Sequence, residues 1–141
     1  MGVDEAGIGQ RGGRRRLAEV LMRVPAPVRF LSGAAFFLLV AVLFVGGAQP
    51  EAAGMFDAHW DKLAHFGYFA LLAVFAMLAS GLRFPALALI AVVVVGLADE
   101  LAQTQLPGRH ANLPDLAFDL AGAVCAVFLL LALQRRYAAR R

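Results

Sequence analysis

Four long apolar runs, separated by short polar segments, dominate the pattern of this chain. The runs cover residues 28–48, 63–82, 84–102 and 114–133. A helix needs about 20 predominantly apolar residues to cross the hydrocarbon core of a bilayer. Arg83 with Pro85 marks a very short turn between the second and third runs, and Pro107 with Gly108 marks a turn before the fourth. The pattern predicts an all-α fold, an integral membrane four-helix bundle without an extramembrane domain.

The composition agrees with a membrane protein. The 141 residues are 61% hydrophobic and their mean hydropathy is +0.72, whereas an ordinary soluble domain is about half apolar. We expect a basic, partly disordered segment over residues 1–27, a membrane domain over residues 28–134 and a basic tail over residues 135–141. A cleaved signal peptide is the alternative for the first run, because Gly46 and Ala48 are small. An uncleaved helix is favoured, since the run exceeds the usual signal-peptide core of about 7–15 residues.

Basic residues are distributed unevenly and indicate the topology. Of the 13 lysines and arginines, eleven lie at or before Arg29, at Arg83, or in the last seven residues. The other two, Lys62 and Arg109, lie in the loops at the opposite ends of the runs. Because cytoplasmic loops are enriched in basic residues, we expect both termini to be cytoplasmic and both other loops to lie outside. Next to spanning runs, basic tails favour anionic membrane lipids over nucleic acid as partners.

Polar and ionisable residues gather at the ends of the runs that should meet on the outer side. Ionisable groups at membrane depth are costly, so they usually face one another or a polar cavity and mark function. Asp61, His65 and Tyr68 have the spacing of one helix face, and Asp119 follows Asp115 by one helical turn. Ten residues form the candidate ligand-binding site: Asp61, Lys62, His65, Tyr68, Asp99, Glu100, Gln103, Arg109, Asp115 and Asp119.

Five carboxylates of this set face two fixed cations, Lys62 and Arg109, and one histidine, His65. Near lipid they cannot all stay charged and unpaired, so they pair with these cations, take up protons or bind a further cation. The amino-terminal ends of the second and fourth runs add positive partial charge, and with Lys62 and Arg109 they can hold a phosphate or carboxylate of a ligand. Gly122, beyond the last aspartate, permits close approach of a neighbouring helix.

Several of these residues have simpler alternatives. Asp61 and Asp115 are good helix-capping residues, the latter together with Asn112. The single Cys125 lies within an apolar run and is expected to be a small packing residue. We predict no resident metal or cofactor, because the spacing matches no strong motif such as HExxH. A divalent cation held by His65 and the carboxylates is the alternative.

Three short motifs occur in order over about residues 60–125. They are Asp61-Lys62-Leu63-Ala64-His65 with Tyr68, then Glu100 and Gln103 with Leu106-Pro107-Gly108-Arg109, then Asp115, Asp119 and Gly122. Together these motifs resemble the VanZ-like family of small bacterial membrane proteins. That family is named for a member linked to teicoplanin resistance. The resemblance implies a four-helix, multi-pass protein of the bacterial cytoplasmic membrane with a polar extracytoplasmic site. Asp119 departs from the Asn that the family often has there.

Binding of an anionic lipid headgroup or a lipid-linked cell-wall precursor is the function we favour, with Lys62 and Arg109 holding the anion. The resemblance implies that this protein acts in the cell envelope, and for some family members this role extends to glycopeptide resistance. A membrane hydrolase or transferase is the second hypothesis: Asp61 orients His65 as general base, Glu100 is the partner acid and Arg109 stabilises negative charge. A structural ion-pair network comes third, and ion coupling by an oligomer comes last.

Overall fold

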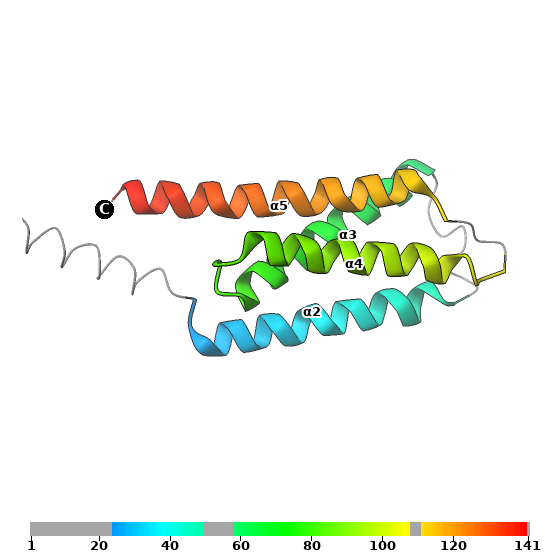
Figure 1. Ribbon diagram of the computed structural model, residues 1–141, viewed down its shortest axis with the longest axis horizontal. Helices are drawn as coiled ribbons and strands as arrows, with labels where there is room; N and C mark the ends of the chain where they lie inside the picture. The colour runs from blue at the N-terminus through cyan, green and yellow to red at the C-terminus, as the bar shows by residue number, and fades with distance from the viewer. Residues whose placement is uncertain (1–23, 50–57, 108–110, 141) are drawn as a thin grey trace, which may run out of the picture.

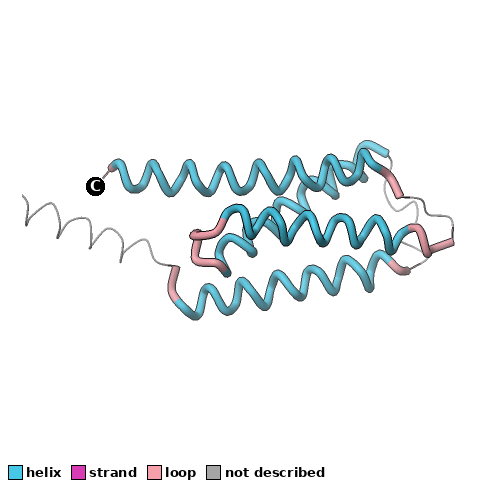
Figure 2. The backbone as a smooth tube through the Cα atoms, in the orientation of Figure 1, coloured by secondary structure: helices cyan, strands magenta, loops and turns pink. Residues whose placement is uncertain are grey.

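A computed structural model describes residues 24–49, 58–107 and 111–140. Within these ranges the chain forms four helices: α2 (Ala26–Gly47), α3 (Ala58–Ala79), α4 (Pro85–Gln103) and α5 (Leu113–Ala139). They form one bundle in which successive helices are antiparallel (Figure 1 and Figure 2). Each of the four is long and apolar enough to cross a membrane. The described part of the chain contains no strand, which confirms the predicted all-α class.

The helix boundaries differ modestly from the predicted spans. Those of α2 and α4 shift by one or two residues. Helix α5 begins one residue earlier than predicted and continues six residues beyond position 133, because no glycine or proline occurs there to end it. Three of the helices carry proline in the first turn, at Pro27, Pro85 and Pro114. The missing N–H of proline costs no intrahelical hydrogen bond at these positions.

Helix α3 ends before the predicted limit of residue 82, because the backbone turns left-handed there. Gly81 has φ +69° and Leu82 has φ +60°. The Leu82 N–H donates to the carbonyl of Met77, and the Gly81 N–H donates to the carbonyl of Leu78. These two hydrogen bonds satisfy carbonyls that the helix end would otherwise leave unpaired. The predicted short turn between the second and third spans is therefore confirmed.

Helix α3 is the centre of the packing. It contacts all three other described helices and packs most extensively against α5. The core is built on the fully buried Phe69, Leu72 and Met77 of α3, with Val92 of α4 and Val127 of α5. A single apolar core thus joins α3 to both later helices and leaves α2 at the edge.

The outer surface of the bundle is apolar. Ser32 is the one residue of α2 that is buried, and Phe30 and Phe37 on the same helix are more than 70% exposed. Phe128 is likewise exposed on α5, and so is Cys125, which therefore packs on the outside of the bundle and not in its core. Such a surface suits contact with lipid acyl chains.

Close contact between α3 and α5 depends on Gly122. A Cβ atom at this position would overlap the backbone carbonyl of Phe66, so α5 can approach α3 this closely only without a side chain there. The predicted role of Gly122 in close helix approach is confirmed. By contrast, a Cβ atom at Gly67 on α3 would have no neighbour within 4 Å.

We predict that Gly122→Ala lowers the stability of the bundle by roughly 1–3 kcal/mol, the usual cost of overpacking. The added methyl group forces α5 away from α3. Gly67→Ala is the matched control, and it should be neutral or slightly stabilising because alanine is the better helix former. Equilibrium unfolding of both variants in mixed detergent micelles measures the difference. Equal stability of the two variants would contradict the packing argument.

Candidate functional site

Lys62 and Asp115 form the outer ion pair of the polar end. Lys62 lies in the first turns of α3, and Asp115 lies in the first turn of α5. The Lys62 Nζ atom is 2.5 Å from Asp115 Oδ1, and the two side chains are 26% and 8% exposed. The ammonium group also lies 6.0 Å from the centre of the Phe118 ring. Lys62 is therefore anchored on α5 but keeps one side open.

His65 and Asp119 form a second pair one helical turn deeper. The distance from His65 Nδ1 to Asp119 Oδ1 is 2.9 Å, and the side chains are 15% and 3% exposed. Because an ionised carboxylate only accepts hydrogen bonds, we assign the proton to Nδ1, which leaves the Nε2 lone pair free. The hypothesis that Asp61 orients His65 is therefore corrected: the residue that orients His65 through a hydrogen bond is Asp119 on α5.

Two further carboxylates lie at the end of α4. Asp99 Oδ2 accepts a hydrogen bond of 2.8 Å from Gln103 Nε2, which confirms that these residues share a face. Glu100 Oε2 accepts a 2.5 Å hydrogen bond from the backbone N–H of Asn112, just before α5. Both acidic residues are buried. Glu100 therefore ties the end of α4 to the start of α5.

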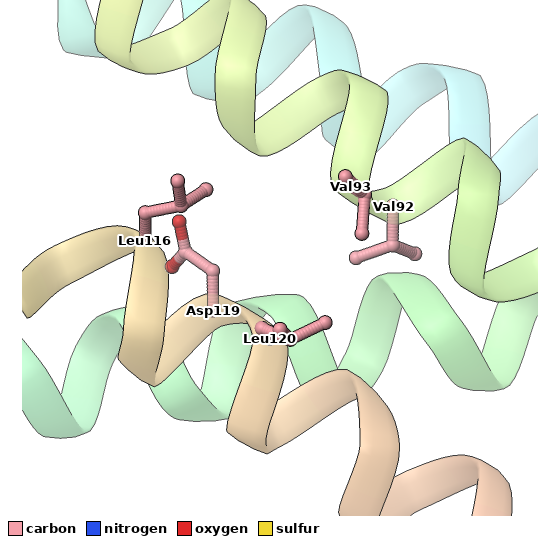
Figure 3. Close-up of a pocket in the computed structure, with 5 residues that line it drawn as sticks. All are labelled: Val92, Val93, Leu116, Asp119 and Leu120. Carbon is pink, nitrogen blue, oxygen red and sulfur yellow. The ribbon is translucent and has the colours of Figure 1, made fainter. Parts of the chain in front are cut away.

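Two buried carboxylate oxygens have no hydrogen-bond donor among the described residues. They are Glu100 Oε1 and Asp119 Oδ2. The latter belongs to a small pocket between α4 and α5, where Figure 3 shows the Asp119 carboxylate beside Leu116 and facing α4. Buried acceptors are nearly always paired in folded proteins, so two at one end of a bundle mark places where a ligand can donate.

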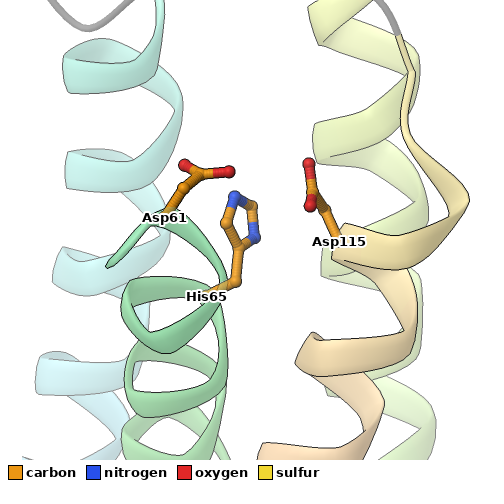
Figure 4. A group of neighbouring side chains, drawn as sticks. All are labelled: Asp61, His65 and Asp115. Atoms are coloured by element: carbon orange, nitrogen blue, oxygen red, sulfur yellow. The ribbon is translucent and has the colours of Figure 1, made fainter. Parts of the chain in front are cut away.

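Asp61, His65 and Asp115 lie close together at the polar end of the bundle. Each offers one ligand atom, and these atoms lie within 4.8 Å of one another. Figure 4 shows the imidazole between the two carboxylates, with its outer nitrogen directed toward the gap between them. One histidine and two carboxylates are a donor set that suits zinc or a harder divalent cation. Lys62 pairs with Asp115, so part of the negative charge of this donor set is neutralised without a metal.

Not every predicted site residue joins this cluster. The Tyr68 hydroxyl donates to the backbone carbonyl of Leu39 on α2, at 2.6 Å, and so it anchors α2 to α3. Arg109 lies outside the described residues. The remaining eight residues, on three helices, meet at one end of the bundle: Asp61, Lys62, His65, Asp99, Glu100, Gln103, Asp115 and Asp119.

Helix capping does not explain the acidic residues. Asp61 lies inside the first turn of α3 and is not its N-cap, because the helix begins at Ala58. Asn112 occupies the N-cap position of α5 but makes no side-chain capping hydrogen bond. Asp115 instead directs its carboxylate to Lys62. The capping alternative for Asp61 and Asp115 is therefore wrong.

Sequence reasoning missed two contributors. The backbone N–H of Asn112 acts as a donor to Glu100, and no residue type signals a backbone contact. Gly96 faces Asp119, since a Cβ atom at Gly96 would lie 3.4 Å from Asp119 Oδ2. A glycine within an apolar run four residues before Glu100 was the available signal for this close approach.

Comparison with known families agrees with the motifs that meet at this end. Residues 18–134 match the sequence model of the family described as VanZ/LLP1. The chain belongs to the VanZ/LLP1 family. No curated protein and no solved structure matches it. The matched range includes α2, α3 and α4 in full and all but the last five residues of α5. The chain is thus a VanZ-family membrane protein with several spans.

We predict that His65→Leu destabilises the bundle by about 3 kcal/mol, because it leaves the buried Asp119 carboxylate without its donor. Adding Asp119→Asn should recover much of this loss by removing the unpaired charge. Equilibrium unfolding in mixed micelles compares both variants with the native protein. The contrary outcome is additivity. If Asp119→Asn lowers the free energy of unfolding by the same amount in the His65→Leu variant as in the native protein, the two residues are not coupled.

Proposed function

We propose that the protein binds the anionic headgroup of an envelope lipid, or of a lipid-linked cell-wall component, at the polar end of the bundle. The observation that carries the proposal is the placement of Lys62. Its ammonium group is held by Asp115 at 2.5 Å, yet the side chain remains about one quarter exposed. A fixed cation at the end of a membrane helix, open on one side, attracts phosphate. Arg109 is the second cation of this proposal.

The carboxylates around Lys62 support a headgroup that also carries hydroxyl groups. Asp61 is partly exposed next to His65 and Asp115, and Glu100 Oε1 has no donor in the described ranges. Acceptors of this kind pair with the hydroxyls of glycerol or a sugar, while they would repel a bare inorganic anion. The combination of one held cation, one partly exposed carboxylate and one buried acceptor without a donor among the described residues favours a phosphate attached to a polyol.

The proposed location is the bacterial cytoplasmic membrane, with the polar end outside and both termini in the cytoplasm. Arg29 and Arg83 lie at the opposite end of the bundle, where α5 also carries Arg135 and Arg136 toward its end (Figure 1). Arg29 donates from Nε to the carbonyl of Ala79. Basic enrichment at one end of a set of spans is the mark of the cytoplasmic side. A contribution to glycopeptide resistance, such as teicoplanin resistance, is part of this proposal through the family resemblance alone.

Native mass spectrometry of the protein released from mild detergent, after incubation with phosphatidylglycerol, tests the headgroup site. Lys62→Gln and Arg109→Gln should each reduce the bound lipid by roughly tenfold, the effect of losing one charge-assisted hydrogen bond. Arg83→Gln is the matched control, because it removes the same charge from the opposite end of the bundle. Retention by the two site variants equal to that of Arg83→Gln would refute the anion site.

A membrane hydrolase or transferase is the second candidate, and the His65–Asp119 pair favours it. A buried carboxylate on Nδ1 fixes the tautomer and leaves Nε2 as a general base, the arrangement found in acid–base enzymes. Asp119 is then the positioning residue, and Glu100 stays the candidate acid. Asp61 loses its assigned role of orienting His65, because the hydrogen bond runs to Asp119.

For this second candidate, we expect lipids in reconstituted vesicles to change mass in the presence of the native protein and not with His65→Ala. Lys62→Gln should weaken lipid binding while a slower conversion persists, because Lys62 binds and His65 transfers protons. Lipid mass spectrometry of the vesicles over time measures both effects. A native protein that binds lipid but leaves every lipid unchanged is a binding protein and not an enzyme.

A further inference from the structure

A second, apolar subsite lies beside the polar end. A pocket of about 80 Å³ lies between α4 and α5, lined by Val92, Val93, Leu116, Leu120 and Asp119 (Figure 3). Its walls are apolar apart from the aspartate. A whole drug-sized ligand needs several hundred cubic ångströms, whereas a cavity needs only about 10–15 Å³ of such volume to hold one water molecule. The pocket therefore fits only a short stretch of a single lipid chain, whose remainder lies in the bilayer.

The aspartate in this pocket has an unused acceptor. The Asp119 side chain is 3% exposed and its Oδ1 atom pairs with His65, while Oδ2 has no partner within the described ranges. Gly96 on α4 lies opposite Oδ2, and a Cβ atom there would come within 3.4 Å of this oxygen and within 3.2 Å of the Leu116 and Phe69 side chains. A buried carboxylate oxygen without a donor is unfavourable, so a ligand that donates a hydrogen bond there gains affinity.

We propose that this pocket is the chain subsite for a lysophospholipid, a single-chain anionic lipid with a free hydroxyl on its glycerol backbone. The hydroxyl donates to Asp119 Oδ2 and the first part of the chain lies against Val93 and Leu120. The inference rests on the proposed function, because the phosphate takes the headgroup place at Lys62.

The spacing of the two aspartates fits this ligand. Asp115, the partner of Lys62, precedes Asp119 by four residues, which is about 6 Å along a helix axis. The phosphate and the free hydroxyl of a lysophospholipid are likewise only a few bonds apart. A second acyl chain on that oxygen removes the donor and adds volume that the pocket does not have. Leu116 lies beside the Asp119 carboxylate and Oδ2 is buried (Figure 3), so the Leu116 side chain must change rotamer for the hydroxyl to enter.

Three probes separate the parts of this inference. They are 1-palmitoyl lysophosphatidylglycerol, its analogue with hydrogen in place of the backbone hydroxyl, and palmitoyl-oleoyl phosphatidylglycerol. Titration of the full chain, followed by native mass spectrometry, should show about tenfold tighter binding of the lysolipid than of its deoxy analogue. Lys62→Gln should weaken the binding of all three probes, because all three carry the phosphate.

Val93→Phe fills the pocket and should weaken lysolipid binding about tenfold. Val94→Phe is the matched control. Val94 is the next residue along α4, its side chain is exposed, and it does not line the pocket. If Val93→Phe fails to fold, Gly96→Ala narrows the same space by one methyl group, and it should reduce the preference for the lysolipid over its deoxy analogue.

The outcomes distinguish the two proposals. Equal binding of the lysolipid and its deoxy analogue, or equal affinities for Val93→Phe and Val94→Phe, overturns the chain subsite. The headgroup site then still stands if Lys62→Gln weakens all three probes. If Lys62→Gln changes none of them, or if no probe binds the native protein, both proposals are wrong.

Discussion

The close contact of α5 with α3 at Gly122 is the constraint on which the polar end depends. A side chain at this position would overlap the carbonyl of Phe66, so the glycine sets both the distance and the register of the two helices. Asp119 and Asp115 precede Gly122 by three and seven residues and lie on the same face. Once α5 is seated, these two aspartates meet His65 and Lys62. The Lys62–Asp115 ion pair and the His65–Asp119 hydrogen bond thus follow from one point of close packing.

The two pairs form layers of decreasing exposure between the end of the bundle and its core. Lys62 is about one quarter exposed, His65 is less exposed, and Phe69, one turn further along α3, is fully buried. The His65 ring is nearly parallel to that of Phe69, with centres 6.3 Å apart. A ligand approaching from the end therefore meets a cation first and a buried carboxylate next. This order suits an amphiphile that places its charge at the surface and its chain in the membrane.

The helices could be predicted from the sequence because length and apolar composition decide whether a segment spans a membrane. The grouping of acidic residues at one end followed from the order of the runs. The pairing of these side chains could not be predicted, because it depends on the rotation of each helix about its axis. Asp61 and His65 have the spacing of a pair, yet His65 bonds to Asp119, since the Gly122 contact brings α5 to that side. Tyr68 follows the same spacing but reaches Leu39 on α2.

A purely structural network accounts for the Lys62–Asp115 and His65–Asp119 pairs but not for the two carboxylate oxygens that have no donor among the described residues. A buried ion pair contributes little net stability, and an unpaired buried carboxylate oxygen costs stability. Neutral or apolar residues in place of Glu100 and Asp119 would serve a bundle better if stability were the only requirement. Both residues instead keep one oxygen without a donor in the described part of the chain. A ligand that brings hydroxyl groups together with a negative charge satisfies these oxygens and Lys62 at once, which neither a bare anion nor a bare cation can do.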